Sequence, residues 1–142
     1  MKQEHKYQYS KYLLYVVLIT LLGVSFFAFY PFKVYEQHYD KLPVFNANHE
    51  VMPGEKLLYA TDFCKYINKP AIVSKWIQNS ELIYFSDVTS NAEIGCRESN
   101  VALLVPEYTT PGKAKLIVLI RYKVNLLQTR EYKLETEDFI IK

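Results

Sequence analysis

The chain has 142 residues, half of them hydrophobic and 23% charged, with a formal net charge of +2. These values exclude a disordered tail and a strongly basic nucleic-acid-binding protein, and the length allows one domain with an appendage. Four glycines are too few for a glycine-rich phosphate loop in addition to the turns of a fold. Thirteen tyrosines are unusual, and seven of them lie in the first forty residues.

Residues 12–32 carry no charged side chain. A helix rises about 1.5 Å per residue, so about twenty residues cross a hydrocarbon core of about 30 Å. Thr20 and Ser25 are the hydroxyl-bearing aliphatic side chains of this segment, and both can bond to carbonyls of their own helix. The segment therefore predicts a transmembrane helix. The alternative of a buried core helix needs a larger protein around it than the rest of this chain provides.

A cleaved signal peptide is the second alternative for this segment, because small residues occur at positions 23–25. The apolar run continues beyond them and has no A-x-A motif, so an uncleaved signal anchor is favoured. The N-terminal flank, residues 1–11, has three lysines against one glutamate, whereas the C-terminal flank is balanced. The positive-inside rule then predicts a single-pass protein of the bacterial inner membrane, with its N-terminus in the cytoplasm and the rest periplasmic or extracellular.

Aromatic rings with one polar end favour the membrane interface, and lysines favour its aqueous side. The residues expected to anchor the span at its two interfaces are Lys11, Tyr12, Tyr15, Tyr30 and Lys33. The lipid bilayer is therefore the first expected partner of this chain.

The two cysteines, Cys64 and Cys96, both fall on the expected outer side of the membrane, where oxidation is permitted. We expect a disulfide between them. Two free buried thiols are one alternative, and a metal site that includes His49 is another, but the spacing matches no known ligand pattern. No metal and no cofactor are therefore expected.

Residues 33–52 have little periodicity and are expected to form a stalk, and a β-rich domain is expected at 53–142. Alternating apolar and polar residues between turn signals predict an antiparallel β-sandwich of about seven short strands. The clearest strands are expected at 56–66, 71–78, 82–86, 101–105, 113–124 and 128–141, with a loop at 87–100. In the longest strand, the core face is expected to carry Ala114, Leu116, Val118, Ile120, Tyr122 and Val124.

A resemblance adds to this expectation. It rests on Pro53-Gly54-Glu55, Cys64-Lys65, Trp76, Gly95-Cys96, Pro111-Gly112, Tyr122-x-Val-Asn125 and Thr136-Glu137-x-Phe139. This order resembles immunoglobulin-like domains, especially those of small single-span membrane proteins of bacteriophages. The resemblance implies that Trp76 lies in the core of a third strand. Cys96 departs from the antibody pattern, because it falls before the 101–105 strand and would attach the 87–100 loop to the second strand.

Catalytic patterns are absent from the sequence. The histidines, His5, His38 and His49, all precede the expected domain, so no nucleophile–histidine–carboxylate site is predicted. Two surfaces are candidates for binding. The loop at 87–100 is either a recognition loop or a plain connection. A row of cations along one strand is either a solvated face or a contact with anionic lipid headgroups, and it consists of Lys113, Lys115, Arg121 and Lys123.

The sequence thus predicts a non-enzymatic, membrane-anchored protein that binds or assembles with another envelope or membrane protein, with no nucleic-acid partner. The resemblance implies a role in altering the host envelope, such as superinfection exclusion or lysis. An accessory subunit of a larger membrane complex, docked through its span, is the alternative, and an envelope hydrolase is the weakest. The oligomeric state is left open.

Overall fold

The computed structural model describes residues 2–30 and 32–142, with side chains described from residue 9 onward. The chain divides into two compact units. The first, here called the helical unit, comprises residues 1–32 and 125–128, and the second, here called the β unit, comprises residues 33–124 and 129–142. Each unit is described by itself.

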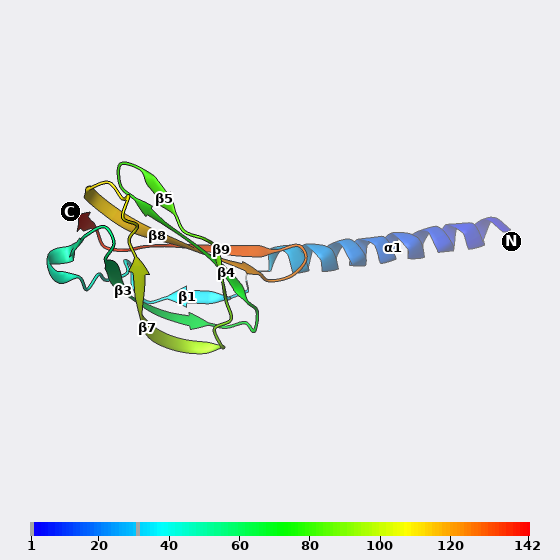
Figure 1. Ribbon diagram of the computed structural model, residues 1–142. Coiled ribbons are helices and arrows are strands. Elements are labelled where there is room, and N and C mark those ends of the chain that lie inside the picture. The colour runs from blue at the N-terminus through cyan, green and yellow to red at the C-terminus, as the bar shows by residue number, and fades with distance from the viewer. Residues whose placement is uncertain (1, 31) are drawn as a thin grey trace. The chain divides into compact units, whose positions relative to one another are not determined.

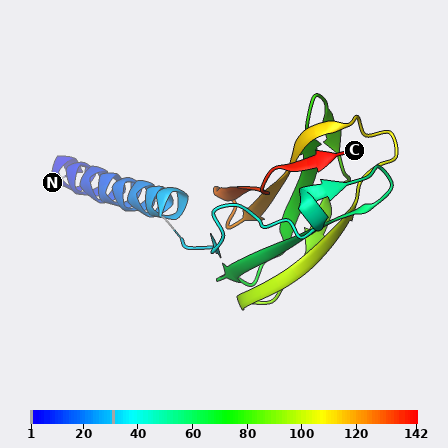
Figure 2. The ribbon, with the colours of Figure 1, turned by 90° about the vertical axis from the view of Figure 1, so that its left-hand side faces the viewer.

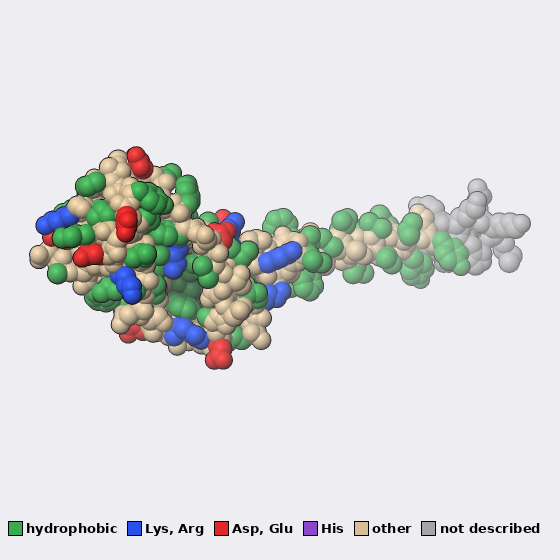
Figure 3. All heavy atoms as spheres, in the orientation of Figure 1, with side chains coloured by type: hydrophobic (Ala, Val, Ile, Leu, Met, Phe, Trp, Pro, Cys, Tyr) green, Lys and Arg blue, Asp and Glu red, His purple; other side chains and the backbone are tan. Residues whose placement is uncertain are grey.

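The helical unit is dominated by α1 (Lys2–Phe29), which confirms the expected apolar helix. Its 21 residues Tyr9–Phe29 have a mean hydropathy of 2.3 and are not buried, so this helix is long and apolar enough to span a membrane. Figure 3 shows hydrophobic side chains along the described part of α1. The Thr20 hydroxyl donates to the Val16 carbonyl at 2.8 Å, so this polar group is satisfied within the helix.

The β unit consists of short strands connected by turns and one 3₁₀ turn, η1 (Ala47–His49). The strands are β1 (Tyr35–Gln37), β2 (Glu50–Val51), β3 (Lys56–Lys65), β4 (Ala71–Gln78), β5 (Leu82–Tyr84), β6 (Val88–Ser90), β7 (Gly95–Leu104), β8 (Gly112–Lys123), β9 (Thr129–Glu135) and β10 (Phe139–Ile141). The expectation of a mainly β protein with one N-terminal apolar helix is therefore confirmed.

These strands form two sheets (Figures 1 and 2). The smaller has the order β1-β3-β7, and the larger has the order β2-β10-β8-β4-β5, with β6 pairing with β4 and β9 pairing with β8. Most pairs are antiparallel, but β10 pairs with β2 in parallel, so the larger sheet is mixed. The edge strand β2 reaches this sheet because residues 33–52 belong to the β unit.

The core lies between the two sheets. Tyr35 on β1 packs against the rings of Tyr122 on β8 and Tyr132 on β9, at centroid distances of 6.1 and 5.1 Å. Strand β8 runs through the middle of the larger sheet, and five of its six expected core residues, Ala114, Leu116, Val118, Ile120 and Tyr122, are buried. The period-two pattern therefore identified the core face of β8, but Ile117, which was expected on the opposite face, is also buried.

Three regions differ from the sequence expectation. The expected loop at 87–100 contains β6 and most of β7, and β7 pairs with β3 along all ten residues. Its polar stretch Arg97–Asn100 has weak strand propensity, but pairing with β3 outweighs that preference. The expected stalk at 33–52 is not separate from the domain, because Val34, Leu42 and Val51 are at most 1% exposed. The expected strand at 128–141 is interrupted after Glu135, where its alternation changes phase.

Candidate functional site: a histidine beside the Cys64–Cys96 disulfide

The expected disulfide joins the two cysteines of the chain. Cys64 and Cys96 are direct partners in the register of β3 and β7, so the bond links neighbouring strands of one sheet. It does not connect the two sheets, as the bridge of an antibody domain does. The two ends of the bond also differ in exposure, because Cys64 is only 3% exposed and Cys96 is an exposed residue.

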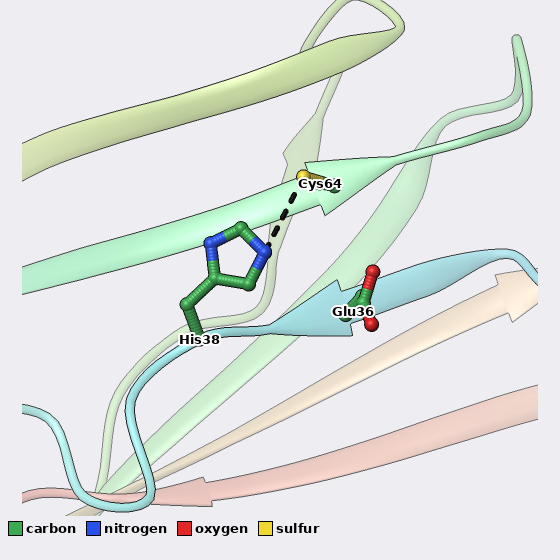
Figure 4. Close-up of side chains that lie close together, drawn as sticks. All are labelled: Glu36, His38 and Cys64. Atoms are coloured by element: carbon green, nitrogen blue, oxygen red, sulfur yellow. Dashed lines mark hydrogen bonds between the residues drawn. The ribbon is translucent and has the colours of Figure 1, made fainter.

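A histidine lies beside the buried sulfur, as Figure 4 shows. The His38 Nε2 atom is 3.5 Å from Cys64 Sγ, and its Nδ1 atom is 3.1 Å from Asp62 Oδ2. Residue 38 directly follows β1, and its backbone N–H donates to the Asp62 carbonyl at 2.9 Å, which places its ring over β3. The prediction that no histidine takes part in the domain is therefore wrong, because the segment assigned to a stalk pairs with β3.

The second carboxylate near this sulfur is already engaged. Glu36 accepts from the Lys33 ammonium at 2.9 Å and from the Tyr66 hydroxyl at 2.6 Å. The hydrogen bond from Lys33 is the main cause that lowers the pKa of Glu36, followed by the bond from Tyr66. Glu36 is consequently held as an anion at the rim of the site, while Asp62 is the carboxylate that contacts the His38 ring.

Three of these residues, Glu36, His38 and Cys64, are of types that bind metal ions. One donor atom each from Glu36, His38 and Cys64 lies within 4.8 Å of the others. A zinc-type site needs a cysteine thiolate, but this sulfur is bonded to Cys96. The donor set therefore does not suit a metal while the disulfide is intact. The arrangement of sulfur, imidazole and carboxylate in series suits proton transfer at sulfur.

Sequence reasoning found the disulfide but missed His38 and Asp62. One part of the signal was available, since Asp62 and Cys64 are two residues apart in an expected strand and must share a face. The position of His38 had no local signal, because it depends on the pairing of Glu36 with Cys64 across β1 and β3.

The structure also shows the surroundings of the predicted cation row on β8. Lys113 pairs with Asp138 at 2.8 Å, and Lys115 pairs with Glu135 at 2.9 Å. Arg121 contacts Asp87 at 3.2 Å and donates to the Ser74 hydroxyl at 3.0 Å. Lys123, at the end of the strand, is exposed. Three of the four charges thus have partners within the β unit, and contact with an anionic surface stays a prediction.

The expected interface residues have these positions. Tyr12 and Tyr15 lie on α1 and Tyr30 directly follows it, with exposed fractions of 70%, 61% and 42%. Lys11 is an exposed residue of α1. Lys33 begins the β unit, where its ammonium also lies 4.9 Å from the centre of the Tyr66 ring. Their role as membrane anchors stays a prediction.

Trp76 does not occupy the core position that the resemblance implied. It is only partly buried, on the face of β4 that alternates with buried Ala71 and Ile77, and its ring contacts the exposed Tyr84 at 5.9 Å. The interior side of β4 instead presents Lys75, whose ammonium lies 6.0 Å from the centre of the Tyr59 ring. Burial lowers the pKa of Lys75, and this lysine lines a cavity of about 170 Å³ between the sheets.

Comparisons with known proteins add little. No protein-family model matches the sequence, and no curated protein matches it significantly. Among solved structures, the chain is similar to a Pseudomonas fluorescens alkylpurine DNA glycosylase, with 18% identity and a TM-score of 0.40 over 70% of this chain and 30% of that one. A Listeria innocua β-glucosidase shows 11% identity and a TM-score of 0.40 over 75% of this chain and 16% of that one. The chain thus spans less than a third of either protein, and these likenesses carry no argument about function.

Proposed function

We propose that this protein is a membrane-anchored binding protein that presents its β unit outside the cytoplasm to another envelope protein. The anchor in this proposal is α1, whose apolar surface extends around the whole helix. Such a helix is stable in a bilayer because all its backbone groups are paired internally and its side chains prefer hydrocarbon to water. The lysine-rich N-terminal flank supports a cytoplasmic N-terminus.

The disulfide supports the same orientation. Disulfides persist in the periplasm and outside cells, whereas cytosolic reductants keep thiols reduced. The Cys64–Cys96 bond lies in the β unit, which begins directly after the expected span. An oxidised β unit and a cytoplasmic N-terminus together require the chain to cross the membrane once.

The observation that carries the binding proposal is the free edge of β7. This ten-residue strand pairs with β3 on one side and has no second neighbour among the described residues. An edge strand of that length offers unpaired N–H and C=O groups to another chain. Natural edges are commonly protected by proline, by charged side chains or by shortness. Strand β7 contains no proline, and its charged residues, Arg97 and Glu98, both lie in its first half, so the stretch 101–104 is an uncharged edge.

An exposed apolar patch lies beside this edge. It is formed by Phe45, Leu58, Ala102 and Leu104, and is here called the β7 patch. Leu58 and Ala102 are register partners, and the three larger side chains are 42–58% exposed. An extended peptide that adds a strand to β7 can pair its backbone with the edge and place alternate side chains on this patch. We therefore propose that the partner is an envelope protein with an exposed extended segment.

Photo-crosslinking tests this proposal in the full chain in bacterial membranes. A photoreactive residue at Ala102 is expected to give a discrete adduct, identified by mass spectrometry as one envelope protein. The matched control carries the same photoreactive residue in place of Glu81, an exposed residue on the turn between β4 and β5. This control is expected to give no adduct. Leu104→Glu is expected to abolish the adduct because it places a charge on the β7 patch.

Equal labelling from both positions, or no adduct from Ala102, would contradict the binding proposal. An adduct of twice the mass of the chain would show that the partner is a second copy of this chain and not another protein.

Two finer expectations, on the topology of the β unit and on its biological role, belong to the same proposal. An immunoglobulin-like topology is supported by two facing, largely antiparallel sheets, and a bacteriophage role in the host envelope rests on the sequence resemblance alone and is tested by the neighbouring genes.

A second candidate, an accessory subunit docked through α1, is favoured by the aromatic rings near the end of the helix. The Phe26 ring contacts the rings of Phe27 and Tyr30 at centroid distances of 6.3 and 4.7 Å, so the three form an exposed aromatic cluster. Close packing drives helix association in membranes. A crosslinker at Phe26 distinguishes the two candidates, because only the subunit hypothesis predicts a specific adduct from the helix.

A further inference from the structure

The Cys64–Cys96 disulfide presents its two sulfur-bearing residues to different environments. Cys96 lies near the start of β7 and is exposed, whereas Cys64 is 3% exposed on β3. A thiolate that attacks a disulfide must approach one sulfur along the S–S axis and expel the other. The exposure of the two residues therefore directs attack to Cys96 and makes Cys64 the leaving group.

The leaving group has an acid in contact with it. His38 Nε2 is 3.5 Å from Cys64 Sγ, so a protonated ring can donate to a developing thiolate. Asp62 Oδ2 lies 3.1 Å from the opposite nitrogen, Nδ1, and accepting a hydrogen bond from it orients the ring with Nε2 toward the sulfur. A neighbouring imidazolium is the arrangement that stabilises thiolates in reactive cysteine proteins, and a stabilised thiolate leaves faster.

The other charged groups around this site have partners of their own. Glu36, on β1, is engaged with Lys33 and Tyr66. Glu98, which is opposite Asp62 on β7, accepts from the Tyr39 hydroxyl at 2.9 Å. Arg97, also on β7, donates to the Glu93 carbonyl at 3.0 Å. Because Glu36, Glu98 and Arg97 are engaged elsewhere, the two ring nitrogens of His38 contact Cys64 Sγ and Asp62.

We propose that the Cys64–Cys96 bond is a thiol–disulfide exchange site for small-molecule thiols, with Cys96 as the attacked sulfur and His38 as the acid for Cys64. The incoming thiol loses its proton to solvent, and its sulfur forms a new bond to Cys96 Sγ. The Cys64–Cys96 bond breaks, and its electron pair passes to Cys64 Sγ, which is protonated by His38 Nε2. A second thiol then releases Cys96 as a thiol and leaves as the small-molecule disulfide.

This exchange goes beyond partner binding, and it does not depend on it. Two electrons from two thiols reduce the bond, and the reverse steps restore it. Because the bond directly links β3 to β7, its state also sets how firmly the edge strand is held to its neighbour. The bond is therefore a reducible covalent link between two strands of the smaller sheet.

The test uses the oxidised full chain in detergent with limiting reduced glutathione at neutral pH. Rates of thiol–disulfide exchange depend on how readily the leaving sulfur departs, so loss of the proton donor beside Cys64 Sγ is expected to slow reduction about tenfold in His38→Asn. His49→Asn is the matched control, because His49 lies on η1, and it is expected to leave the rate unchanged. Asp62→Asn is expected to lie between the two.

Two further measurements separate this chemistry from a structural effect. Mass spectrometry of the acid-quenched reaction is expected to find glutathione on Cys96 and not on Cys64. In Cys96→Ser, the ultraviolet absorbance of the Cys64 thiolate is expected to persist to lower pH than in Cys96→Ser/His38→Asn. Equal reduction rates for the His38 and His49 variants, glutathione on Cys64, or two free thiols in the isolated native chain would each overturn the proposal.

Discussion

The helix α1 and the β unit use the same apolar residue types in opposite ways. Leucine side chains of α1 are 46–69% exposed, whereas Leu57 and Leu116 in the β unit are fully buried. The β unit provides its own apolar environment, because two sheets cover each other. A single helix cannot do this, so the apolar surface of α1 needs an apolar solvent or another helix. The comparison shows that hydrophobic residues alone do not define a core, since the core requires a second layer.

The largest expected effect comes from adding charge to α1. Leu18→Arg/Leu22→Arg places two charges inside the span, each costing about 3 kcal/mol at the middle of a transmembrane helix. We expect this variant to move from the carbonate-resistant membrane pellet to the soluble fraction. The matched control, Leu82→Arg/Leu104→Arg, charges two exposed leucines of the β unit and should stay in the pellet. If both variants stay in the pellet, α1 is not the membrane anchor.

A smaller effect, on the free energy of unfolding, is expected from removing one methylene group from the core of the β unit. Ile77 is fully buried and Ile72 is 47% exposed, and both lie on β4. Ile77→Val should lower the free energy of unfolding by about 1 kcal/mol, whereas Ile72→Val should change it by less than about 0.5 kcal/mol. Isoleucine and valine are both β-branched and have similar strand propensities, so the two variants differ mainly in the burial of the lost group. Urea unfolding of the full chain, followed by the fluorescence of Trp76, measures the difference, and equal losses would disprove the assignment of the buried face of β4.

The smallest expected effect is on the acid dependence of the free energy of unfolding. Charged side chains are absent from residues 12–29 of α1, whereas the β unit carries several ion pairs. The hydrogen bond from Lys115, followed by that from Lys133, lowers the pKa of Glu135 below its ordinary value of 4.5. A lowered folded-state pKa contributes stability above pH 4.5, and this stability is lost as the pH falls through the folded-state value. Because the pair is partly exposed, we expect about 0.5 kcal/mol.

Unfolding free energies measured across this acid range give the test for Glu135. The wild-type chain should lose this increment, and Glu135→Gln should not, because the amide does not titrate. High salt should reduce the difference between the two chains by screening. A larger acid loss in Glu135→Gln than in wild type would mean that Lys115 does not stabilise the carboxylate.

Several features of this protein follow from local pattern and could be predicted. The bounds of β4 match the expected strand at 71–78, because its alternation is uninterrupted and a turn follows it. The buried face of β8 was predicted for the same reason. The pairing of Cys64 with Cys96 needed only a count of two cysteines on one side of the expected membrane span.

Other features depend on distant segments and could not be predicted locally. Arg97–Asn100 is polar and was expected to be a loop, yet it forms the middle of β7 because β3 supplies its hydrogen bonds. Lys65 is 2% exposed, and burial, followed by the nearby Arg97, lowers its pKa. A lysine in a strand sequence gives no sign of such burial, because its environment is built by other strands.

The sequence by itself determined that an apolar helix with an uncharged segment long enough to cross a membrane precedes a domain of short strands with two cysteines. Periodicity and length act within a segment, so they can be recognised without the fold. Only the tertiary structure decided that His38 lies beside Cys64, that Trp76 faces away from the core, and that one edge of β7 has no neighbouring strand among the residues described. These features depend on which strands become neighbours, and strand pairing joins residues that are far apart along the chain.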